Sequence, residues 1–328
     1  MESESYSFVI PAYNDAAGLR RNFEYFFDRS ENIQLVIIDD ASTDDTEALI
    51  ALAKPPKNVR IDYHRQAQNA GPAAARNKGL AMATGDFIMF LDADDLLADC
   101  FFTYVNLSPL RNGADFVLFK YHLGTTDGQR YSYEMHGIDN TFFSRIEKSG
   151  FPLGTFTVRD IPSVLKTVNF PWNKIYRREF IQNAGISFPD QRMHEDILPH
   201  WHSFLRAKSF GILSWAPPLI THYETPGGDR ATNYVGELRL GLFPLMKDLY
   251  GDVRENPSAD LFLPEFNSFC GDLFSWMIDV LCAGKGPETR SWRARYQQEI
   301  DDFHAFLETC DEKDGHNFSL PFADRRQK

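Results

Sequence analysis

Short apolar runs alternate with helix-like polar stretches along the first 120 residues of the chain. Runs of this length, bounded by turn residues, are typical of buried strands, and the stretches between them have the spacing of helices. Strands are expected at Tyr6–Ala12, Gln34–Asp39, Val59–His64, Phe87–Leu91 and Ala114–Tyr121. Helices are expected at Ala16–Phe27, Asp44–Ala53, Pro72–Ala83 and Ala98–Leu110. This alternation predicts an α/β fold built on a doubly wound, mostly parallel sheet.

The pattern changes twice further along the chain. From about residue 122 to 170 it loosens into Gly, Thr, Asp and aromatic residues, which predicts loops with short antiparallel strands. Two further helices and two further strands are expected at Arg177–Ala184, Glu195–Ala207, Phe210–Leu213 and Leu219–Tyr223. From 234 to about 310, apolar residues recur at helical spacing, so this part is expected to be helical.

Composition and charge narrow the class of protein. The net charge is −12 and no long basic run occurs, so nucleic-acid binding is not expected, because neutralising phosphates requires a surface of Lys and Arg. None of the four cysteines forms a Cys-x-x-Cys pair, which argues against a zinc site. A strand-like segment begins almost at once, at Tyr6, so a secretory leader is not expected, and no apolar run is long enough to cross a membrane. We expect a cytoplasmic protein, with the inner face of the membrane as an alternative location.

Carboxylates gather at the ends of two of the predicted strands. Asp39 and Asp40 follow the second strand, and Asp92-Ala93-Asp94-Asp95 follows the fourth. Ligands of open parallel sheets bind outside the carboxyl ends of the strands. Carboxylates spaced as Asp-x-Asp can hold a hard divalent cation, and this cation can bridge a diphosphate. The alternative for such a run is a polar loop in which an Asp caps the next helix.

The order and spacing of several short strings resemble the family 2 glycosyltransferases, which have the GT-A fold. The strings are Val9-Ile10-Pro11-Ala12-Tyr13-Asn14, Val36-Ile37-Ile38-Asp39-Asp40-Ala41-Ser42-Thr43-Asp44, Asn69-Ala70-Gly71 with Ala75-Arg76-Asn77, and Asp92-Ala93-Asp94-Asp95. A later string, Asn173-Lys174-Ile175-Tyr176-Arg177, is similar to members that build bacterial polysaccharides. The resemblance covers roughly residues 5–225. It implies a Rossmann-like, mostly parallel central sheet flanked by helices, with a C-terminal helical extension outside the resemblance.

The resemblance also implies a division of the chain. Residues 1–225 would form the catalytic domain, with a nucleotide-binding half at about 1–120 and an acceptor-binding half at 121–225. Residues 226–328 would form the helical extension. Its apolar stripes are expected to pack between helices and on the catalytic domain, and homodimer or peripheral membrane contact is the alternative.

A nucleotide-sugar site and a metal site are implied by the same comparison of strings. Residues expected on the nucleotide sugar are Pro11, Ala12, Tyr13, Asp40, Arg76, Asp92, Ala93 and Arg230. Among them, Pro11 to Tyr13 would pack on the base and ribose, and Arg230 would close over the diphosphate. Asp94 and His222 would hold Mn²⁺ or Mg²⁺. Two acids are expected to be structural: Asp39 would cap a helix or end a strand, and Asp95 would cap the following helix.

The catalytic base is expected at the start of the helix that follows His194. By resemblance, Asp196 takes the proton from the attacking hydroxyl, and Glu195 is the second choice or shapes the acceptor pocket. Acids at this place also stabilise helix N-termini, which is the alternative. For the sugar, Trp172 would offer a stacking face, and Asn173 and Lys174 would offer hydrogen bonds. A core Trp beside a basic helix start is the alternative for this segment.

Together these residues imply an inverting, metal-dependent glycosyltransferase. The donor would be a nucleoside-diphosphate sugar, UDP-linked as the family's commonest type, and the acceptor a hydroxyl of a glycan or glycolipid in cell-surface polysaccharide synthesis. A sugar nucleotidyltransferase is the first alternative, although such enzymes open with a Gly-rich basic signature that Pro11–Asn14 does not match. A non-catalytic nucleotide-sugar-binding protein and a retaining transferase are the others.

Overall fold

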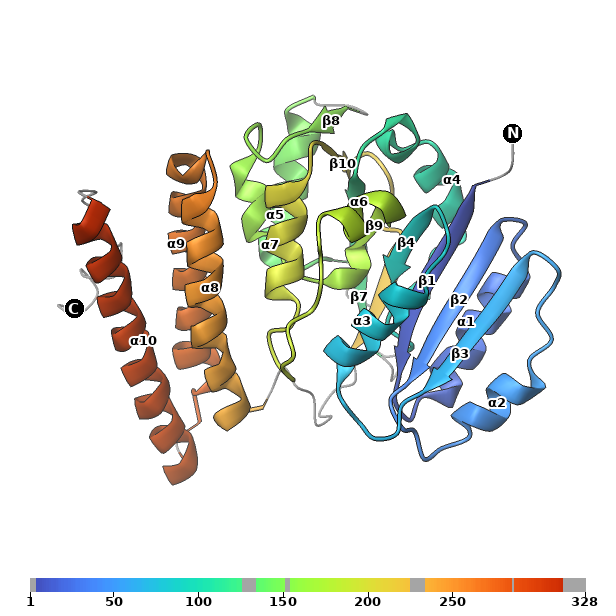
Figure 1. The fold of residues 1–328 in the computed structure, drawn as a ribbon, viewed down its shortest axis with the longest axis horizontal. Coiled ribbons are helices and arrows are strands. Elements are labelled where there is room, and N and C mark those ends of the chain that lie inside the picture. The colour runs from blue at the N-terminus through green and yellow to red at the C-terminus, as the bar shows by residue number, and fades with distance from the viewer. Residues whose placement is uncertain (1–3, 126–133, 151–153, 225–233, 285, 315–328) are drawn as a thin grey trace. The chain divides into compact units, whose positions relative to one another are not determined.

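The chain folds into two compact units, Met1–Gly227 and Gly228–Lys328. The computed structural model describes residues 4–125, 134–150, 154–224, 234–284 and 286–314, with residues 224 and 311–314 described by backbone alone (Figure 1). The predicted boundary at residue 225 lies outside the described residues. The functional roles given to the parts on either side of it remain a prediction.

An eight-stranded sheet forms the centre of the first unit, in the order β3-β2-β1-β4-β9-β6-β10-β8 (Figure 1). Its strands are β1 (Ser5–Ala12), β2 (Asn32–Asp39), β3 (Val59–Arg65), β4 (Phe87–Phe90), β6 (Phe116–Phe119), β8 (Thr155–Phe156), β9 (Lys174–Arg177) and β10 (Phe210–Leu213). Of these, β8 and β9 run antiparallel to their neighbours, and the remaining pairs are parallel. The predicted α/β class with a mostly parallel sheet is confirmed.

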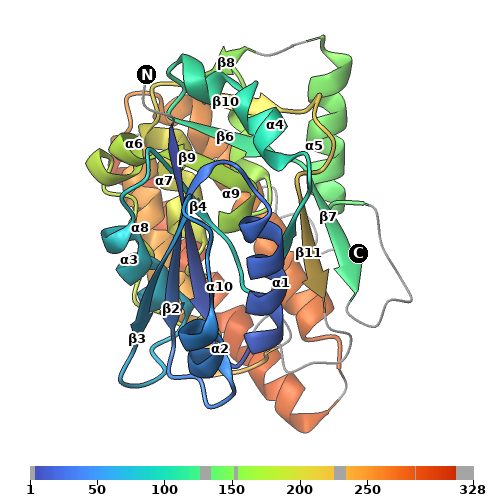
Figure 2. The same cartoon turned by 90° about the vertical axis from the view of Figure 1, so that its right-hand side faces the viewer.

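Helices cover both faces of this sheet. They are α1 (Ala16–Phe27), α2 (Thr46–Leu52), α3 (Pro72–Met82), α4 (Phe101–Asn106), α5 (Gly137–Lys148), α6 (Arg178–Asn183) and α7 (Ile197–Arg206). Figure 2 shows α1 and α3 on opposite sides of the strands. Side chains alternate across a strand, so Phe8 of β1 packs its ring 4.5 Å from Phe26 of α1, while Val9 faces Gly79 of α3. Strand β1 is therefore buried on both faces.

The register of the parallel strands brings three loops together at one edge of the sheet, the one formed by the carboxyl ends of the strands. Ala12 pairs with Asp39 across β1 and β2. The amide of Asp40 donates to the carbonyl of Ala12 at 2.8 Å, and the amide of Leu91 donates to Val9 at 3.0 Å. The segments after β1, β2 and β4 thus leave the sheet side by side. This is the edge at which open parallel sheets bind their ligands.

A second, three-stranded sheet lies beside the first and has the order β5-β11-β7. Its strands are β5 (Leu96–Leu97), β7 (Tyr121–Thr125) and β11 (Ile220–Glu224). The single strand expected at 114–121 is corrected here: it divides at Lys120 into β6 of the large sheet and β7 of the small one. Strand β11 returns from far along the chain and places its residues next to the segment after β4.

Two other predicted elements differ from the structure. The helix expected at 98–110 ends as α4 at Asn106, and a 3-10 helix, η1 (Pro109–Asn112), follows. Pro109 accounts for the break, because the residue before a proline is pushed out of the helical region. The loop expected at 122–170 contains α5 and the 3-10 helix η2 (Pro162–Lys166). A third 3-10 helix, η3 (Pro171–Asn173), leads directly into β9.

The second unit is helical, as predicted. It contains η5 (Glu237–Gly241), α8 (Leu242–Glu255), α9 (Ala259–Ser275), the π-helix η6 (Trp276–Leu281) and α10 (Pro287–Asp314). Its core is aromatic: the rings of Phe243 and Phe274 stack 5.7 Å apart, and Phe303 meets Phe274 edge-on at 5.6 Å. Among the described residues, no helix has both the length and the apolar character that a membrane span requires.

Candidate active site

The turn after β1 is pinned to the end of β2. The backbone amide of Asn14 donates to the hydroxyl of Ser42 at 2.9 Å, and the Asn14 side chain accepts from the amide of Thr43 at 2.7 Å. Asn14 has a φ of 53°, the left-handed conformation that Asn tolerates well. These contacts hold the predicted segment Pro11 to Tyr13 at the sheet edge, with 53% of Tyr13 exposed. An exposed aromatic ring at this place offers a surface on which a nucleotide base can pack.

The two acids after β2 are both engaged by hydrogen bonds. Asp39 accepts from the amide of Ser42 and from Tyr63 and Arg65, all at 2.7 Å. Burial alone would raise the pKa of Asp39, but these bonds and the charge of Arg65 outweigh burial and lower the pKa. A structural role for Asp39, as expected, accounts for all these contacts.

Asp40 organises the loop that precedes α3. Its carboxylate accepts from the amides of Ala70 and Gly71, at 2.7 and 2.8 Å, and from the side chain of Gln66 at 2.8 Å. Gly71 has a φ of 90°, a conformation that a residue with a Cβ rarely adopts. The matched string Asn69-Ala70-Gly71 is thus held in place by the acid of another matched string. The expected contact of Asp40 with the base remains a prediction.

Arg76 of α3 joins two carboxylates that are distant in sequence. Its Nη2 lies 2.8 Å from Oδ1 of Asp92, and its Nη1 lies 3.1 Å from Oε1 of Glu195. The side chain is buried, and the guanidinium also lies over the ring of Phe188, 5.4 Å from its centroid. Burial acts to lower the pKa of Arg76, but the charges of Asp92 and Glu195 prevail and raise it. The structure therefore brings together the predicted residues Arg76, Asp92 and Glu195.

The acidic run after β4 meets β11 at a second cluster. Nδ1 of His222 lies 2.8 Å from Oδ1 of Asp95, and the amide of Tyr223 donates to the same oxygen at 3.2 Å. Potential ligand atoms of Asp92, Asp95 and His222 lie within 4.8 Å of one another. Within the described residues this group does not include Asp94, which was expected to bind the metal together with His222. The proposed ligand set is therefore Asp92, Asp95 and His222, with Asp94 beside it.

The expected role of Asp95 as a helix cap is wrong. Asp95 is fully buried and is followed by β5, while α4 begins only at Phe101. Its Oδ1 is drawn to His222, a tertiary contact that spacing along the chain does not reveal. Its Oδ2 has no hydrogen-bond partner among the described residues. A buried carboxylate oxygen of this kind is costly unless something satisfies it, and a divalent cation held by oxygen and imidazole ligands would do so.

Protons and a cation compete at this cluster. Burial raises the pKa of Asp95 to about 7. Burial acts to lower the pKa of His222, but the charge of Asp95 and the hydrogen bond to it raise this pKa to about 9. The raised pKa of His222 favours its protonated form beside the carboxylate of Asp95. A metal that bound His222 would have to displace this proton, so its affinity should increase with pH.

The predicted base lies at the start of α7. Asp196 precedes the first residue of the helix, but its side chain makes no capping hydrogen bond to the described backbone of α7. Burial and the neighbouring charge of Glu195 raise the pKa of Asp196 to about 7, against the opposing charges of Arg76 and Lys174. A carboxylate with a pKa near neutrality has the proton affinity that a general base requires. The alternative role as a helix cap is not favoured.

Three residues expected to contact the sugar are buried beneath the site. Trp172, Asn173 and Lys174 expose 1%, 0% and 0% of their surface. The ring of Trp172 stacks on Phe170 and His222, with centroids 4.3 and 4.8 Å away. The expectation that Trp172 stacks on a sugar is therefore corrected, and so is direct sugar contact by Asn173 and Lys174. Strand β9 enters the middle of the sheet, which explains why its first residue and those before it are enclosed.

Lys174 is instead a buried lysine whose amine is bonded within the protein. Its Nζ donates to the carbonyl of Phe170 and to Oδ1 of Asn173, both at 2.8 Å. Burial lowers the pKa of Lys174 to about 7, although the carboxylates of Asp139 and Asp196 act in the opposite direction. Asp139 was not among the predicted residues, because it lies in the segment where loops were expected. Arg230, expected over the diphosphate, lies outside the described residues.

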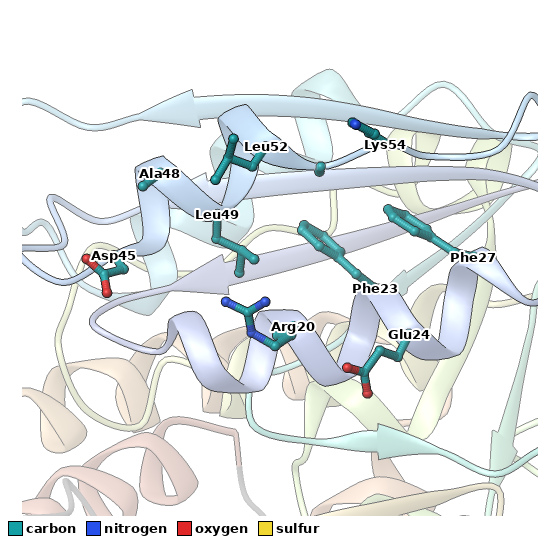
Figure 3. Close-up of a pocket in the computed structure, with 10 residues that line it drawn as sticks. Arg20, Phe23, Glu24, Phe27, Asp45, Ala48, Leu49, Leu52 and Lys54 are labelled. Atoms are coloured by element: carbon teal, nitrogen blue, oxygen red, sulfur yellow. The ribbon is translucent and has the colours of Figure 1, made fainter.

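A groove of about 460 Å³ lies between α1 and α2, away from these residues. Figure 3 shows Phe23 and Phe27 on one wall and Leu52 with Lys54 on the other. None of the residues that line the groove belongs to the predicted site. The groove is therefore not part of the candidate active site, which lies at the sheet edge formed by the ends of β1, β2 and β4.

Comparison with known families decides what kind of protein carries this site. The profile of Glycosyl transferase family 2 matches residues 7–185, more than half of the chain. The chain belongs to this family. The matched range contains the three acidic segments after β1, β2 and β4, and also Trp172, Asn173 and Lys174. The protein is thus a glycosyltransferase, and the sugar nucleotidyltransferase is set aside.

Two bacterial relatives illustrate the similarity. This glycosyltransferase is 25% identical over 280 residues to the putative glycosyltransferase EpsH of Bacillus subtilis (strain 168), covering 82% of this chain and 75% of EpsH. It is 25% identical over 214 residues to the poly(ribitol-phosphate) beta-N-acetylglucosaminyltransferase TarS of Staphylococcus aureus (strain Mu50 / ATCC 700699). That match covers 64% of this chain but 34% of TarS, so the two proteins correspond over part of TarS.

The fold has a close counterpart among solved structures. The crystal structure of S. aureus TarS 1-349 in complex with UDP-GlcNAc superposes with a TM-score of 0.63 and 18% sequence identity. The match covers 98% of this chain and 95% of that chain. The family 2 glycosyltransferase therefore has the GT-A fold that its sequence implied. A sequence identity of 18% supports a conclusion about the fold alone.

Proposed function

We propose that this family 2 glycosyltransferase is an inverting, metal-dependent enzyme that transfers a sugar from a UDP-sugar to a hydroxyl of a glycan or glycolipid. One observation carries the proposal: a single guanidinium, that of Arg76, bonds Asp92 of the acidic run and Glu195 beside the base. The donor end and the acceptor end of a transfer reaction are thereby parts of one site. Cell-surface polysaccharide synthesis is the process we assign to it.

UDP-GlcNAc is the donor to test first. A protein of similar fold, TarS, was crystallised with this molecule, and the full-length relative is named as an N-acetylglucosaminyltransferase acting on poly(ribitol phosphate). In this chain the nucleotide would lie along Pro11, Ala12 and Tyr13, beside the loop held by Asp40. Asp92 and Ala93 would contact the ribose side, and Arg230 would approach the diphosphate.

The metal site fits a hard divalent cation. Asp92, Asp95 and His222 would hold Mn²⁺ or Mg²⁺, with Asp94 as a further carboxylate next to them. Two carboxylates and an imidazole suit Mn²⁺ in particular, because Mg²⁺ prefers oxygen ligands. When bound, the cation neutralises negative charge on the leaving diphosphate as a Lewis acid. The buried and unpartnered Oδ2 of Asp95 supports this assignment.

Asp196 acts as the general base in this proposal. Its carboxylate removes the proton from an acceptor hydroxyl as the oxygen forms a bond to the anomeric carbon of the sugar. The bond from that carbon to the diphosphate oxygen breaks on the opposite face, so the configuration inverts. Arg76 would keep Glu195 in place next to the base, and the buried Lys174 would limit the accumulation of negative charge behind it.

The location follows from the acceptor. Nucleotide sugars and a soluble acceptor would meet in the cytoplasm, and a glycolipid acceptor would bring the reaction to the inner face of the membrane. The helices of the second unit are then the proposed contact with the membrane surface or with a second copy of the chain. Sedimentation with anionic lipid vesicles and the oligomeric state in solution would separate these two roles.

A direct experiment distinguishes the enzyme from a non-catalytic binding protein. The full chain is incubated with UDP-GlcNAc, with and without Mn²⁺, and the release of UDP is followed. The wild-type protein should show metal-dependent release, and Asp196→Asn should lose it while still binding UDP. UDP binding without release by the wild type would favour the binding protein. Near-full activity of Asp196→Asn would remove Asp196 as the base.

A further inference from the structure

We propose that Asn77 is a positioning residue that holds the catalytic base in register with the donor site. The segment at issue is 184–196, which joins α6 to α7 and ends in Glu195 and Asp196; we refer to it as the base loop. The proposal rests on the assignment of Asp196 as the base. It assigns a role to Asn77, the second polar residue of the string Arg76-Asn77, which takes no part in the proposed transfer reaction.

Asn77 binds the base loop at two points on one residue. Its Nδ2 donates to the carbonyl of Phe188 at 2.7 Å, and its Oδ1 accepts from the amide of Phe188 at 2.9 Å. The side-chain amide thereby satisfies both backbone hydrogen-bonding groups of Phe188, as pairing with a neighbouring strand would do. The Phe188 ring is buried and meets Phe90, the last residue of β4, edge-on at 4.9 Å. The middle of the base loop is thus fixed relative to both α3 and β4.

Two arginines complete the attachment. Near the end of the base loop, Glu195 is bonded by Arg76 at 3.1 Å. Between these points, Nη2 of Arg192 donates to the carbonyl of Asn69 at 3.0 Å, in the loop that Asp40 organises. The base loop is therefore tied to α3, or to the loop before α3, at three successive places. All three ties connect it to the nucleotide-binding half of the unit.

The base loop needs these ties, because it has little structure of its own. Residues 187–196 form neither helix nor strand. His194, two residues before the base, has a φ of 60°, a left-handed conformation that is unfavourable for residues with a Cβ and persists when surrounding contacts enforce it. Helix α3 is a rigid support, since Gly79 lets it lie directly against Val9 of β1. The position of α3 thereby sets the position of the base.

Loosening this attachment should affect chemistry more than binding. A small displacement of the base from the acceptor hydroxyl greatly lowers the rate of proton removal, whereas the proposed nucleotide contacts lie outside the base loop. Replacing a residue that only stabilises the fold would lower the melting temperature without lowering kcat more than it changes the donor KM. The ratio between the change in kcat and the change in donor KM therefore identifies a positioning role.

The chain offers a matched control in Asn58. Its Nδ2 donates to the carbonyls of Arg29 and Glu31, at 2.8 and 2.9 Å, so Asn58→Ala also removes two hydrogen bonds between a side chain and the backbone. Asn58 lies just before β3, at the opposite edge of the sheet from Asp39 and Asp92. Both variants, Asn77→Ala and Asn58→Ala, should lower the melting temperature by similar amounts.

The expected result is a difference in kcat between the two variants. Asn77→Ala should lower kcat for UDP release from UDP-GlcNAc with Mn²⁺ by about tenfold or more, with donor KM within about twofold of wild type. Asn58→Ala should keep both values. Equal kcat in the two variants, or a rise in donor KM that matches the fall in kcat, would overturn the proposal.

Amide hydrogen exchange tests the attachment without relying on activity. In Asn77→Ala the amides of the base loop, that of Phe188 first, should exchange about tenfold faster or more, while those of α7 and β4 keep their rates. Asn58→Ala should leave the base loop unchanged. If the wild type released no UDP, the proposed function would fail, but exchange would still decide whether Asn77 holds the base loop. Unchanged exchange in Asn77→Ala would refute the inference by itself.

Discussion

Arg76 forms an ion pair with Glu195 across 119 residues of chain, with 3.1 Å between Nη1 and Oε1. Its other terminal nitrogen is bonded to Asp92. One buried cation thus neutralises an acid of the donor side and an acid of the base side at the same time. Substitutions at this site should therefore affect stability, metal use and proton transfer in separable ways.

Replacing Arg76 by Met should destabilise the first unit by about 3 kcal/mol, at the lower end for broken buried ion pairs because Asp92 keeps some contact with solvent. The cause is that Asp92 and Glu195 both lose their cation. Denaturant unfolding measures the effect. The matched control is Arg60→Met, which breaks the exposed pair with Asp62 and should cost less than about 1 kcal/mol. Equal losses in the two variants would contradict the bridging role.

The pH profile should reveal the base. Asp196 must be ionised to accept a proton, and its pKa is raised to about 7 by burial and by Glu195. At saturating Mn²⁺, kcat/KM should therefore rise about tenfold per pH unit below 7 and become level above it.

In Glu195→Gln the repelling charge is gone, so the pKa of Asp196 falls and the rise should occur at lower pH. Glu47→Gln changes an exposed acid elsewhere and should leave the profile unchanged. A Glu195→Gln profile that coincides with that of wild type would speak against Asp196.

Metal titrations should distinguish two candidate ligand sets. Chelation with EDTA should abolish UDP release, and Mn²⁺ should restore it. Asp95→Asn and His222→Ala should each raise the Mn²⁺ concentration for half-maximal activity by about 10- to 100-fold or more, because each removes a member of the group that the geometry assembles.

Asp94→Asn provides the comparison, because the resemblance to the family implied Asp94 as the ligand. We expect a smaller increase in the Mn²⁺ requirement than for Asp95→Asn. The exposed acid Asp99 serves as a control, and Asp99→Asn should have no effect on this requirement. A larger effect at Asp94 than at Asp95 would return the assignment to Asp94, as the family resemblance implied.

Gly79→Ala should destabilise the first unit by about 1–3 kcal/mol. A Cβ at this position would lie 2.4 Å from Cγ1 of Val9, so α3 would have to move away from β1. Such a shift would also displace Arg76 and Asn77, and transfer should slow.

The control is Gly137→Ala at the start of α5, where no atom lies within 4 Å of the new Cβ and stability should stay within about 0.5 kcal/mol of wild type. Thermal unfolding and UDP release measure both; a stable, active Gly79→Ala would show that α3 has more room than its packing indicates.

The nucleotide-binding strands could be predicted from the sequence because their signals are local. Helix α1 has the predicted bounds, Ala16–Phe27, and strands β1 to β4 lie where the apolar runs occur. Strand β9 could not be recognised in this way. It is four residues long, and its place between β4 and β6 is set by pairing with segments far away in the chain. The division of 114–121 at Lys120 has the same origin, since its two halves join different sheets.

The site was predictable as a set of acids at one sheet edge, but the partner of each acid was not. His222 lies 127 residues after Asp95, and nothing in the local pattern indicates which carboxylate of the run points towards it. The burial of Trp172 was considered only as the alternative, and that of Lys174 was missed, because the strand that encloses them was not foreseen. Asn77 was quoted as part of a matched string, and its function became visible only through its contact with Phe188, 111 residues later.

The central place of β9 limits how this protein can be divided. Any fragment that ends before Lys174 leaves β4 without its partner on that side, and all four residues of β4 are buried in the complete unit. An apolar strand with an unpaired edge promotes association between chains. A recombinant piece that stops near residue 120 should therefore aggregate, even though it carries every nucleotide-binding string. During synthesis, β9 would pair with β4, and the proposed base Asp196 would follow within about twenty-two residues, from 174 to 196.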